Sequence, residues 1–104
     1  MANVRLIKDS DNLIVVDELY DKRAGGSYIN DATVTATIAN LAGTAVTGQT
    51  LPLTLSYVTG SNGRYEGILD DGLALALNIQ YEVTITAVKD GLKRVWKERA
   101  FCST

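Results

Sequence analysis

Residues 80–88 read QYEVTITAV, and this stretch decides the fold class because apolar and polar side chains alternate along its length. The apolar set is Tyr81, Val83, Ile85 and Ala87, and the polar set is Glu82, Thr84 and Thr86. Alternation with period two places the two sets on opposite faces of a β-strand. We therefore predict a core strand here, with the apolar set facing inward.

Residues 31–39 (DATVTATIA) repeat the pattern, with Val34, Ala36 and Ile38 set against three threonines. Further strands are predicted, between polar or glycine-rich turns, at residues 3–7, 12–20, 51–58, 64–69, 73–77 and 92–101. Residues 72–79 (GLALALNI) would also suit a short helix, but their leucines fit period two and a strand is favoured. About seven or eight short strands predict an all-β fold, an antiparallel β-sandwich formed by one domain, residues 1–104.

Residues 60–72 (GSNGRYEGILDDG) resemble a glycine-rich phosphate loop at first sight. A phosphate loop requires a lysine and a hydroxyl residue after its last glycine, and a helix after these. Here Gly63 precedes an arginine and then a strand pattern. Asn62 and Gly63 both tolerate positive φ, so we predict that they form the tight turn of a β-hairpin.

The same stretch predicts how the returning strand packs. At period two, Tyr65 and Leu69 face the core, with Gly67 in a crowded position between them. Residues 70–72 (DDG) are predicted to form the next turn.

Composition excludes several function classes. The net charge of −2 and the pI near 4.9 disfavour nucleic-acid binding, although half of the basic residues lie in residues 89–99. Asp90 and Glu98 interrupt that basic run, so it indicates a solvated strand face. No window is apolar enough to span a membrane, and the first residues lack a signal-peptide pattern. The single cysteine, Cys102, fits synthesis in a reducing cytoplasm.

Catalytic and metal chemistry are not expected. The chain has no histidine, which removes the commonest general base and metal ligand. Carboxylate pairs remain, but a small sandwich offers little room for a cleft between them. Four aspartates could supply calcium with oxygen ligands, but they lack the spacing of a calcium loop: Asp9, Asp11, Asp70 and Asp71. We predict a non-enzymatic protein without cofactor or metal.

Three aromatic residues are candidates for special roles. Leu75 lies six residues before Tyr81, which is similar to the tyrosine corner of immunoglobulin-like sandwiches, where the phenol bonds back to the preceding connection. The alternative is that Tyr81 is an ordinary strand residue. Trp96 and Phe101 lie on opposite faces of the last strand pattern, so one faces the core and the other is a candidate partner contact.

Three stretches together carry a family resemblance: YINDATVTATI (residues 28–38), LTLSYVTGSNGRYEGIL (53–69) and QYEVTITAVKDG (80–91). They resemble the small immunoglobulin-like proteins encoded among the virion genes of tailed bacteriophages and prophages. The resemblance implies an immunoglobulin-like β-sandwich that is made in the bacterial host cytoplasm and built into the virion. Its implied partners are other virion proteins of capsid, neck or tail, and copies of itself in a symmetric assembly.

The rival hypothesis is an adhesive or carbohydrate-binding module. It predicts exposed aromatic side chains on one face or at loop tips, and the candidates are Tyr20, Tyr28 and Tyr57.

Overall fold

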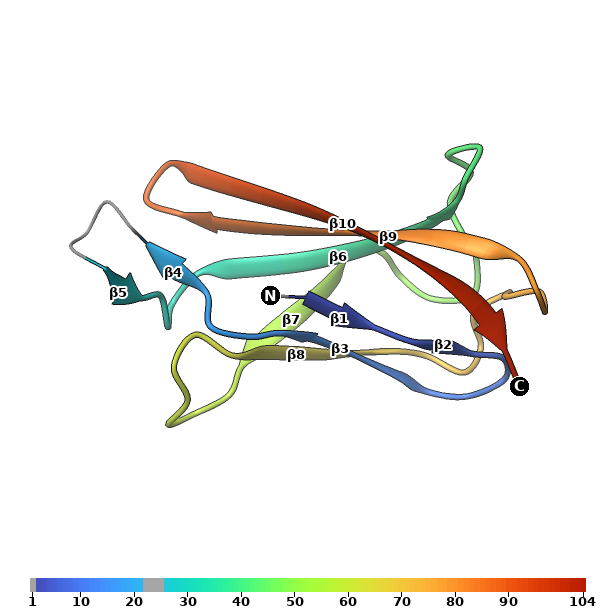
Figure 1. Cartoon of the computed structure of the whole chain (residues 1–104), viewed down its shortest axis with the longest axis horizontal. Coiled ribbons are helices and arrows are strands. Elements are labelled where there is room, and N and C mark those ends of the chain that lie inside the picture. Colours follow the sequence, from blue (N-terminus) through green and yellow to red (C-terminus); the bar gives the residue numbers. More distant parts are fainter. Residues whose placement is uncertain (1, 22–25) are drawn as a thin grey trace.

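The computed structural model describes residues 2–21 and 26–104, and this part of the chain contains strands and no helix (Figure 1). Its strands are β1 (Ala2–Val4), β2 (Leu6–Ile7), β3 (Asn12–Val16), β4 (Tyr20–Asp21), β5 (Ser27–Tyr28), β6 (Thr33–Asn40), β7 (Leu53–Tyr57), β8 (Tyr65–Leu69), β9 (Gln80–Lys89) and β10 (Leu92–Ser103). The predicted all-β class is confirmed. The small β4–β5 pair was not predicted.

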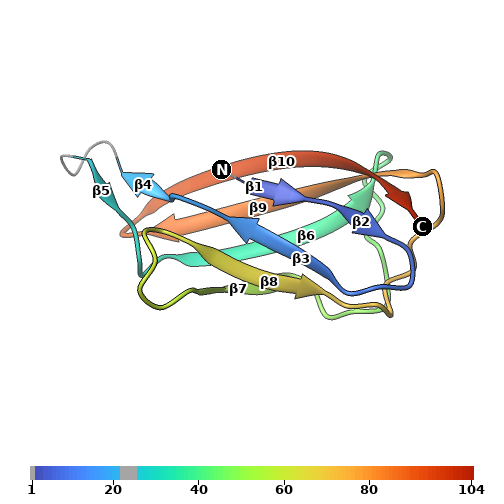
Figure 2. The same cartoon turned by 60° about the horizontal axis from the view of Figure 1, so that its bottom comes forward.

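Eight of these strands follow one hydrogen-bonded order, β1-β3-β8-β7-β6-β9-β10-β2, which bends into two layers (Figures 1 and 2). β7 joins the layers because Leu53 and Leu55 pair with β6, whereas Ser56 and Tyr57 pair with β8. β1 and β2 also join the two layers. β1 pairs antiparallel with β3, and after Arg5 the chain continues as β2, which pairs parallel with β10. The two layers therefore enclose a shared core.

One cluster of buried side chains fills the space between the layers. The predicted inner faces of the two long strands are confirmed, since these residues are at most 5% exposed: Val34, Ala36, Ile38, Tyr81, Val83, Ile85 and Ala87. From the other layer, Tyr65 and Leu69 are at most 1% exposed. A Cβ at Gly67 would lie 3.2 Å from side-chain atoms of Leu53 and Leu55, so the predicted crowding is confirmed.

Residues 73–77 do not form the predicted strand. Leu73 and Leu75 alternate into the core as strand residues would, at 5% and 6% exposure. Their backbone groups bond locally, however: the Leu73 N–H donates to the Asp70 carbonyl at 3.1 Å, and the Leu75 N–H to the Leu73 carbonyl at 2.9 Å. Asn78, with φ of 62°, then turns the chain toward β9. Alternating burial here comes from successive turns and not from a paired strand.

The β7–β8 hairpin is present, but its chain reversal lies earlier than predicted. The Ser61 N–H donates to the Val58 carbonyl at 3.0 Å, and Gly60 inside that turn has φ of 82°. The Ser61 hydroxyl donates to the same carbonyl at 2.6 Å and so holds the earlier turn. Gly63 has φ of 70°, but Asn62 does not have positive φ. The prediction of a two-residue turn at Asn62 and Gly63 is therefore wrong.

Candidate functional site

The register of β10 against β9 decides which of its side chains face solvent. Trp96 lies opposite Ile85 and Ala100 opposite Tyr81, so these two β10 residues are on the inner face and pack against the core. Phe101 is on the other face and is 62% exposed. Of the two candidate partner contacts, the structure exposes Phe101 and turns Trp96 inward.

This difference predicts unequal effects of substitution. Phe101→Ser is expected to change the free energy of unfolding by about 0.5 kcal/mol or less, because little of the ring is buried. Trp96→Ala is expected to destabilise by about 2 kcal/mol, because the indole contacts the core from a half-buried position. Urea denaturation of both variants measures the difference, and a larger loss for Phe101→Ser would contradict the assignment of faces.

One long edge of β10 has no hydrogen-bonded strand within the described part of the chain, although β1 lies close to part of it. From Leu92 to Phe101 the strand pairs with β9 on one side. On its other side β2 pairs with Cys102 and Ser103, near the C-terminus. Figure 2 shows the rest of β10 running past β1 to the β9–β10 hairpin. Such an edge presents backbone N–H and C=O groups to solvent.

Basic side chains follow this edge strand. They are Lys93, Arg94, Lys97 and Arg99. Lys97 and Arg99 both lie near the Glu82 carboxylate, at 3.9 and 3.4 Å. The Arg94 guanidinium lies 5.2 Å from the centre of the Trp96 ring, a cation–π contact. Within the described residues, no carboxylate forms an ion pair with the first two basic residues, which lie nearest to the β9–β10 hairpin.

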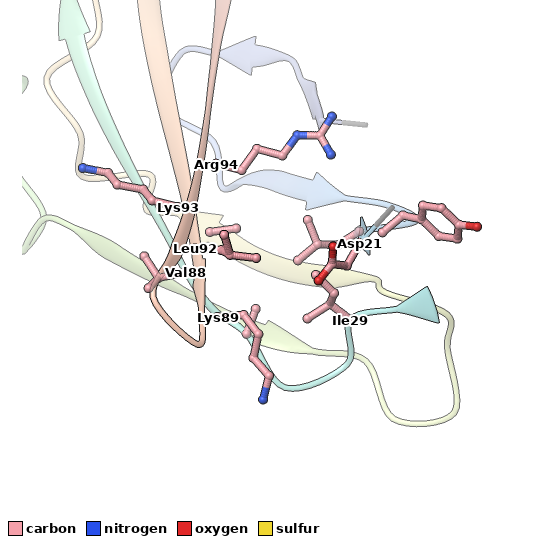
Figure 3. A pocket seen from close by; sticks show the side chains of 11 residues that line it. Asp21, Ile29, Val88, Lys89, Leu92, Lys93 and Arg94 are labelled. Carbon is pink, nitrogen blue, oxygen red and sulfur yellow. The ribbon is translucent and has the colours of Figure 1, made fainter. Parts of the chain in front are cut away.

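A pocket of about 340 Å³ opens beside the start of β10 (Figure 3). One wall comes from the chain around β4 and β5, through Leu19, Ile29 and Ala32, and the other from the β9–β10 hairpin, through Ala87 and Leu92. Lys89, Lys93 and Arg94 add cationic groups to this mostly apolar lining, and Asp21 adds a carboxylate. Lys89 is paired with Asp31 at 2.6 Å. The pocket was not predicted, because its walls come from distant parts of the sequence.

Tyr81 is 5% exposed at the start of β9. Its phenol oxygen accepts a hydrogen bond of 2.8 Å from the backbone N–H of Ala76, five residues upstream. Leu75 beside it is also buried. This is the backward hydrogen bond expected of a tyrosine corner.

A second tyrosine performs a similar task and was missed as a site residue. The Tyr65 hydroxyl donates to the Ile29 carbonyl at 2.7 Å and accepts from the Ala32 N–H at 3.0 Å. It thereby ties β8 to the segment that leads into β6 in the other layer. Burial is the main cause that raises the pKa of this phenol. The sequence signal was present, since Tyr65 was predicted to face the core.

Gly63 is buried and packs directly against another backbone segment. Its carbonyl accepts from the Leu19 N–H at 3.0 Å, and its own N–H donates to the Asn30 side-chain oxygen at 2.8 Å. A Cβ at this position would lie 2.6 Å from the Leu19 nitrogen. Asn62 beside it is exposed. Gly63 is therefore a position of close backbone approach.

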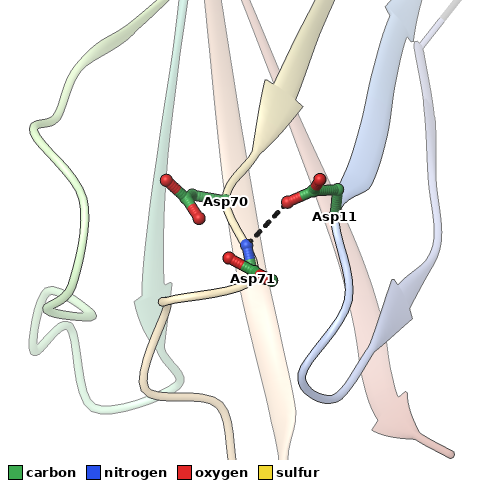
Figure 4. A group of neighbouring side chains, drawn as sticks. All are labelled: Asp11, Asp70 and Asp71. Atoms are coloured by element: carbon green, nitrogen blue, oxygen red, sulfur yellow. Dashed lines mark hydrogen bonds between the residues drawn. The ribbon is translucent and has the colours of Figure 1, made fainter.

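Three aspartates meet where β3 and β8 border their turns (Figure 4). The Asp71 N–H donates to an Asp11 carboxylate oxygen at 2.9 Å, and the Gly72 N–H donates to Asp70 at 3.0 Å. The bond from Gly72 lowers the pKa of Asp70. The bond shared with Asp70, followed by the charge of Asp11, raises the pKa of Asp71. All three residues are exposed, and exposed carboxylates with backbone partners are ordinary turn chemistry.

The raised pKa of Asp71 predicts a pH effect. A raised folded-state pKa contributes stability that is present at low pH and lost as the pH rises through that pKa. We therefore expect Asp71→Asn to raise the Tm at neutral pH, and the gain to vanish in acid and shrink in high salt. Thermal melts across pH and NaCl measure this. A wild-type Tm that rises with CaCl₂, with the rise lost in Asp71→Asn, would instead indicate a cation site.

Comparisons with protein-family models, curated proteins and solved structures gave no match for this chain. Among the described residues, no helix is long and apolar enough to cross a membrane. The geometry of the site therefore carries the functional argument.

Proposed function

We propose that this chain is an immunoglobulin-like module that acts through protein–protein contacts as a structural component of a tailed-phage virion. The fold part of the proposal is supported by strand order. Immunoglobulin domains place their first, second, fourth and fifth strands in one layer and their third, sixth and seventh in the other. We count β1 and β2 as one first strand and leave out the β4–β5 pair. This first strand then shares one layer with β3, β7 and β8, and the other layer is formed by β6, β9 and β10.

The hydrogen bond between Tyr81 and Ala76 carries this assignment. In immunoglobulin-like sandwiches the corner tyrosine lies near the start of the sixth strand and bonds to backbone a few residues upstream. β9 is the sixth strand by the count above, and Tyr81 is its second residue. Strand order and corner agree with the family resemblance of the sequence.

The virion role is supported by exposed apolar side chains that could contact other proteins. Apolar side chains are exposed on the outer face of β10, with Val95 at 46% and Phe101 at 62% exposure, beside an unpaired strand edge. A modest contact surface of this kind suits an assembly in which symmetry repeats it many times. The absence of histidine from the chain fits a role without catalysis.

Mass spectrometry of purified particles from the phage or prophage that encodes the chain tests this role. We expect the protein at a fixed ratio to the major capsid or tail protein. Particles assembled with Phe101→Ser are expected to contain less of it, while Ile68→Ser, which removes a similarly exposed apolar side chain from the outer face of β8 in the other layer, leaves the ratio unchanged. Absence of the wild-type protein from particles would refute the virion role.

A carbohydrate-binding role is a second candidate because two exposed tyrosines lie together. Tyr20 and Tyr28 are 38% and 42% exposed, and their rings meet edge to face with centroids 5.5 Å apart. The third candidate, Tyr57, is half-buried and donates to the Ser61 carbonyl. A glycan array with the wild type and Tyr28→Ala distinguishes the roles, since saturable sugar binding that the variant loses would favour the second.

A further inference from the structure

The unpaired edge of β10 and the pocket beside it form one continuous surface. Leu92 belongs to both, since it begins β10 and lines the pocket. The opposite wall of the pocket, with Leu19 and Ile29, belongs to the chain beyond β3. β1 pairs with β3 as far as Val16 and lies close to β10 without pairing with it, so in the described chain no strand is hydrogen-bonded to this stretch of the β10 edge.

We propose that this surface binds an extended, acidic segment of a partner protein, which adds as a strand to the β10 edge and places one apolar side chain in the pocket. The proposal deepens the protein–protein role above and rests on it, because it names the surface and the kind of partner.

The backbone of β10 supplies the first part of the site. The edge from Leu92 to Ala100 is about 30 Å long at a strand rise of roughly 3.3 Å per residue. A strand of this length presents outward N–H and C=O groups at every second residue, which an added strand can bond. These bonds can hold an extended segment of almost any sequence, and side-chain contacts then set its register.

The charges of β10 select the partner. Four of its residues are basic, and Glu98 is its one acidic residue. A second copy of the chain is a poor occupant, because pairing β10 with another β10 would bring like charges onto neighbouring strands. An acidic segment would instead meet Lys93 and Arg94, which form no ion pair with any other described residue.

The pocket supplies an anchor. Its walls are mostly apolar, and it opens at the hairpin end of the same edge, between Ile29 and Leu92 (Figure 3). Alternate side chains of an added strand point to the same face, so one of them would reach the pocket while the backbone pairs with β10. A leucine or an aromatic ring would bury its apolar surface there.

Binding of a defined peptide to the whole protein tests the proposal. The probe is an N-acetylated peptide of about nine residues in which valine or isoleucine alternates with glutamate and one position is leucine. We expect saturable binding with a Kd of about 100 µM in low salt. Amide exchange followed by NMR is expected to slow at alternate residues of β10 between Leu92 and Ala100.

Two altered peptides distinguish backbone pairing from simple charge attraction. N-methylation at alternate positions removes the donors along one side of the peptide, and we expect affinity to fall at least about tenfold. Replacing glutamate by lysine is expected to abolish binding. Equal affinity for the N-methylated peptide, equal affinity for the lysine peptide, or slowed exchange outside β10 would each overturn the proposal.

Protein variants complete the test. Lys93 is on the outer face of β10, the face that the peptide's glutamates would share, and Lys93→Glu is expected to weaken binding of the acidic peptide about tenfold or more. Lys8→Glu makes the same charge change beside Ser103, at the opposite end of β10, and leaves affinity unchanged. Ala32→Leu narrows the pocket. It is expected to weaken binding of the leucine peptide but not binding of a peptide in which that leucine is replaced by alanine. Matching Tm values show that the variants are folded. If the wild type does not bind at about 1 mM peptide, or if it dimerises through β10, this proposal is overturned. Either result leaves the virion role to be decided by mass spectrometry of particles.

Discussion

Gly63→Val is expected to destabilise the protein by about 4 kcal/mol or more, a large part of the total stability of a domain of this size. Two effects add. Gly63 has φ of 70°, a left-handed conformation that a β-branched residue rarely adopts. A side chain would also collide with backbone, since its Cβ would lie 2.6 Å from both the nitrogen and the oxygen of Leu19. Urea denaturation monitored by tryptophan fluorescence measures the loss.

Asparagine substitutions distinguish the close approach from a simple turn requirement. Asparagine tolerates positive φ, so a residue needed for a turn alone would accept it. Gly60 has φ of 82° and open space around it, and Gly60→Asn is expected to cost about 1 kcal/mol or less. Gly63→Asn is expected to cost several times more, because its Cβ meets the Leu19 backbone. Equal costs at the two positions would contradict the packing explanation.

The strand faces could be predicted from sequence because the alternation is produced by burial itself. In residues 31–39 and 80–88 the polar set is threonine or glutamate and the apolar set fills the core, so one assignment of faces is possible. In β10 the inner face includes Glu98, and the outer face includes Val95 and Phe101. Its orientation depends on pairing with β9, which the residues of β10 do not encode.

Other features depended on backbone partners that no local pattern reports. Leu73 and Leu75 are buried alternately, as a strand requires, yet successive turns place them there. The hairpin was predictable from its glycines, but the position of its turn depends on Ser61, whose hydroxyl bonds the Val58 carbonyl. The pocket beside β10 required the tertiary structure, because its walls come from residues near 20, 30 and 90.

Tyr65→Phe is expected to cost about 2–3 kcal/mol, because it removes a hydroxyl with two backbone partners and leaves both unpaired. These partners are the Ile29 carbonyl and the Ala32 N–H, at 2.7 and 3.0 Å, and the ring is 1% exposed.

Tyr81→Phe is the matched control. Its hydroxyl has one backbone partner, the Ala76 N–H, so we expect a loss of about 1 kcal/mol. Both substitutions keep the ring and create no cavity. Equal or reversed losses in urea denaturation would contradict the view that the hydroxyl of Tyr65 joins the two layers.

The pH dependence of stability gives a second test of Tyr65→Phe. Burial raises the pKa of Tyr65, so the unfolded chain releases this proton at lower pH than the folded protein. The stability linked to this phenol is fully present below its unfolded pKa of about 10 and is lost as the pH rises through the folded value. Tyr65→Phe removes this titration, and its unfolding free energy should fall less steeply than that of the wild type above about pH 10. Equal pH dependence of the unfolding free energy in the wild type and Tyr65→Phe would show that the Tyr65 phenol ionises equally in the folded and unfolded states. That result would contradict a buried hydroxyl that donates to the Ile29 carbonyl.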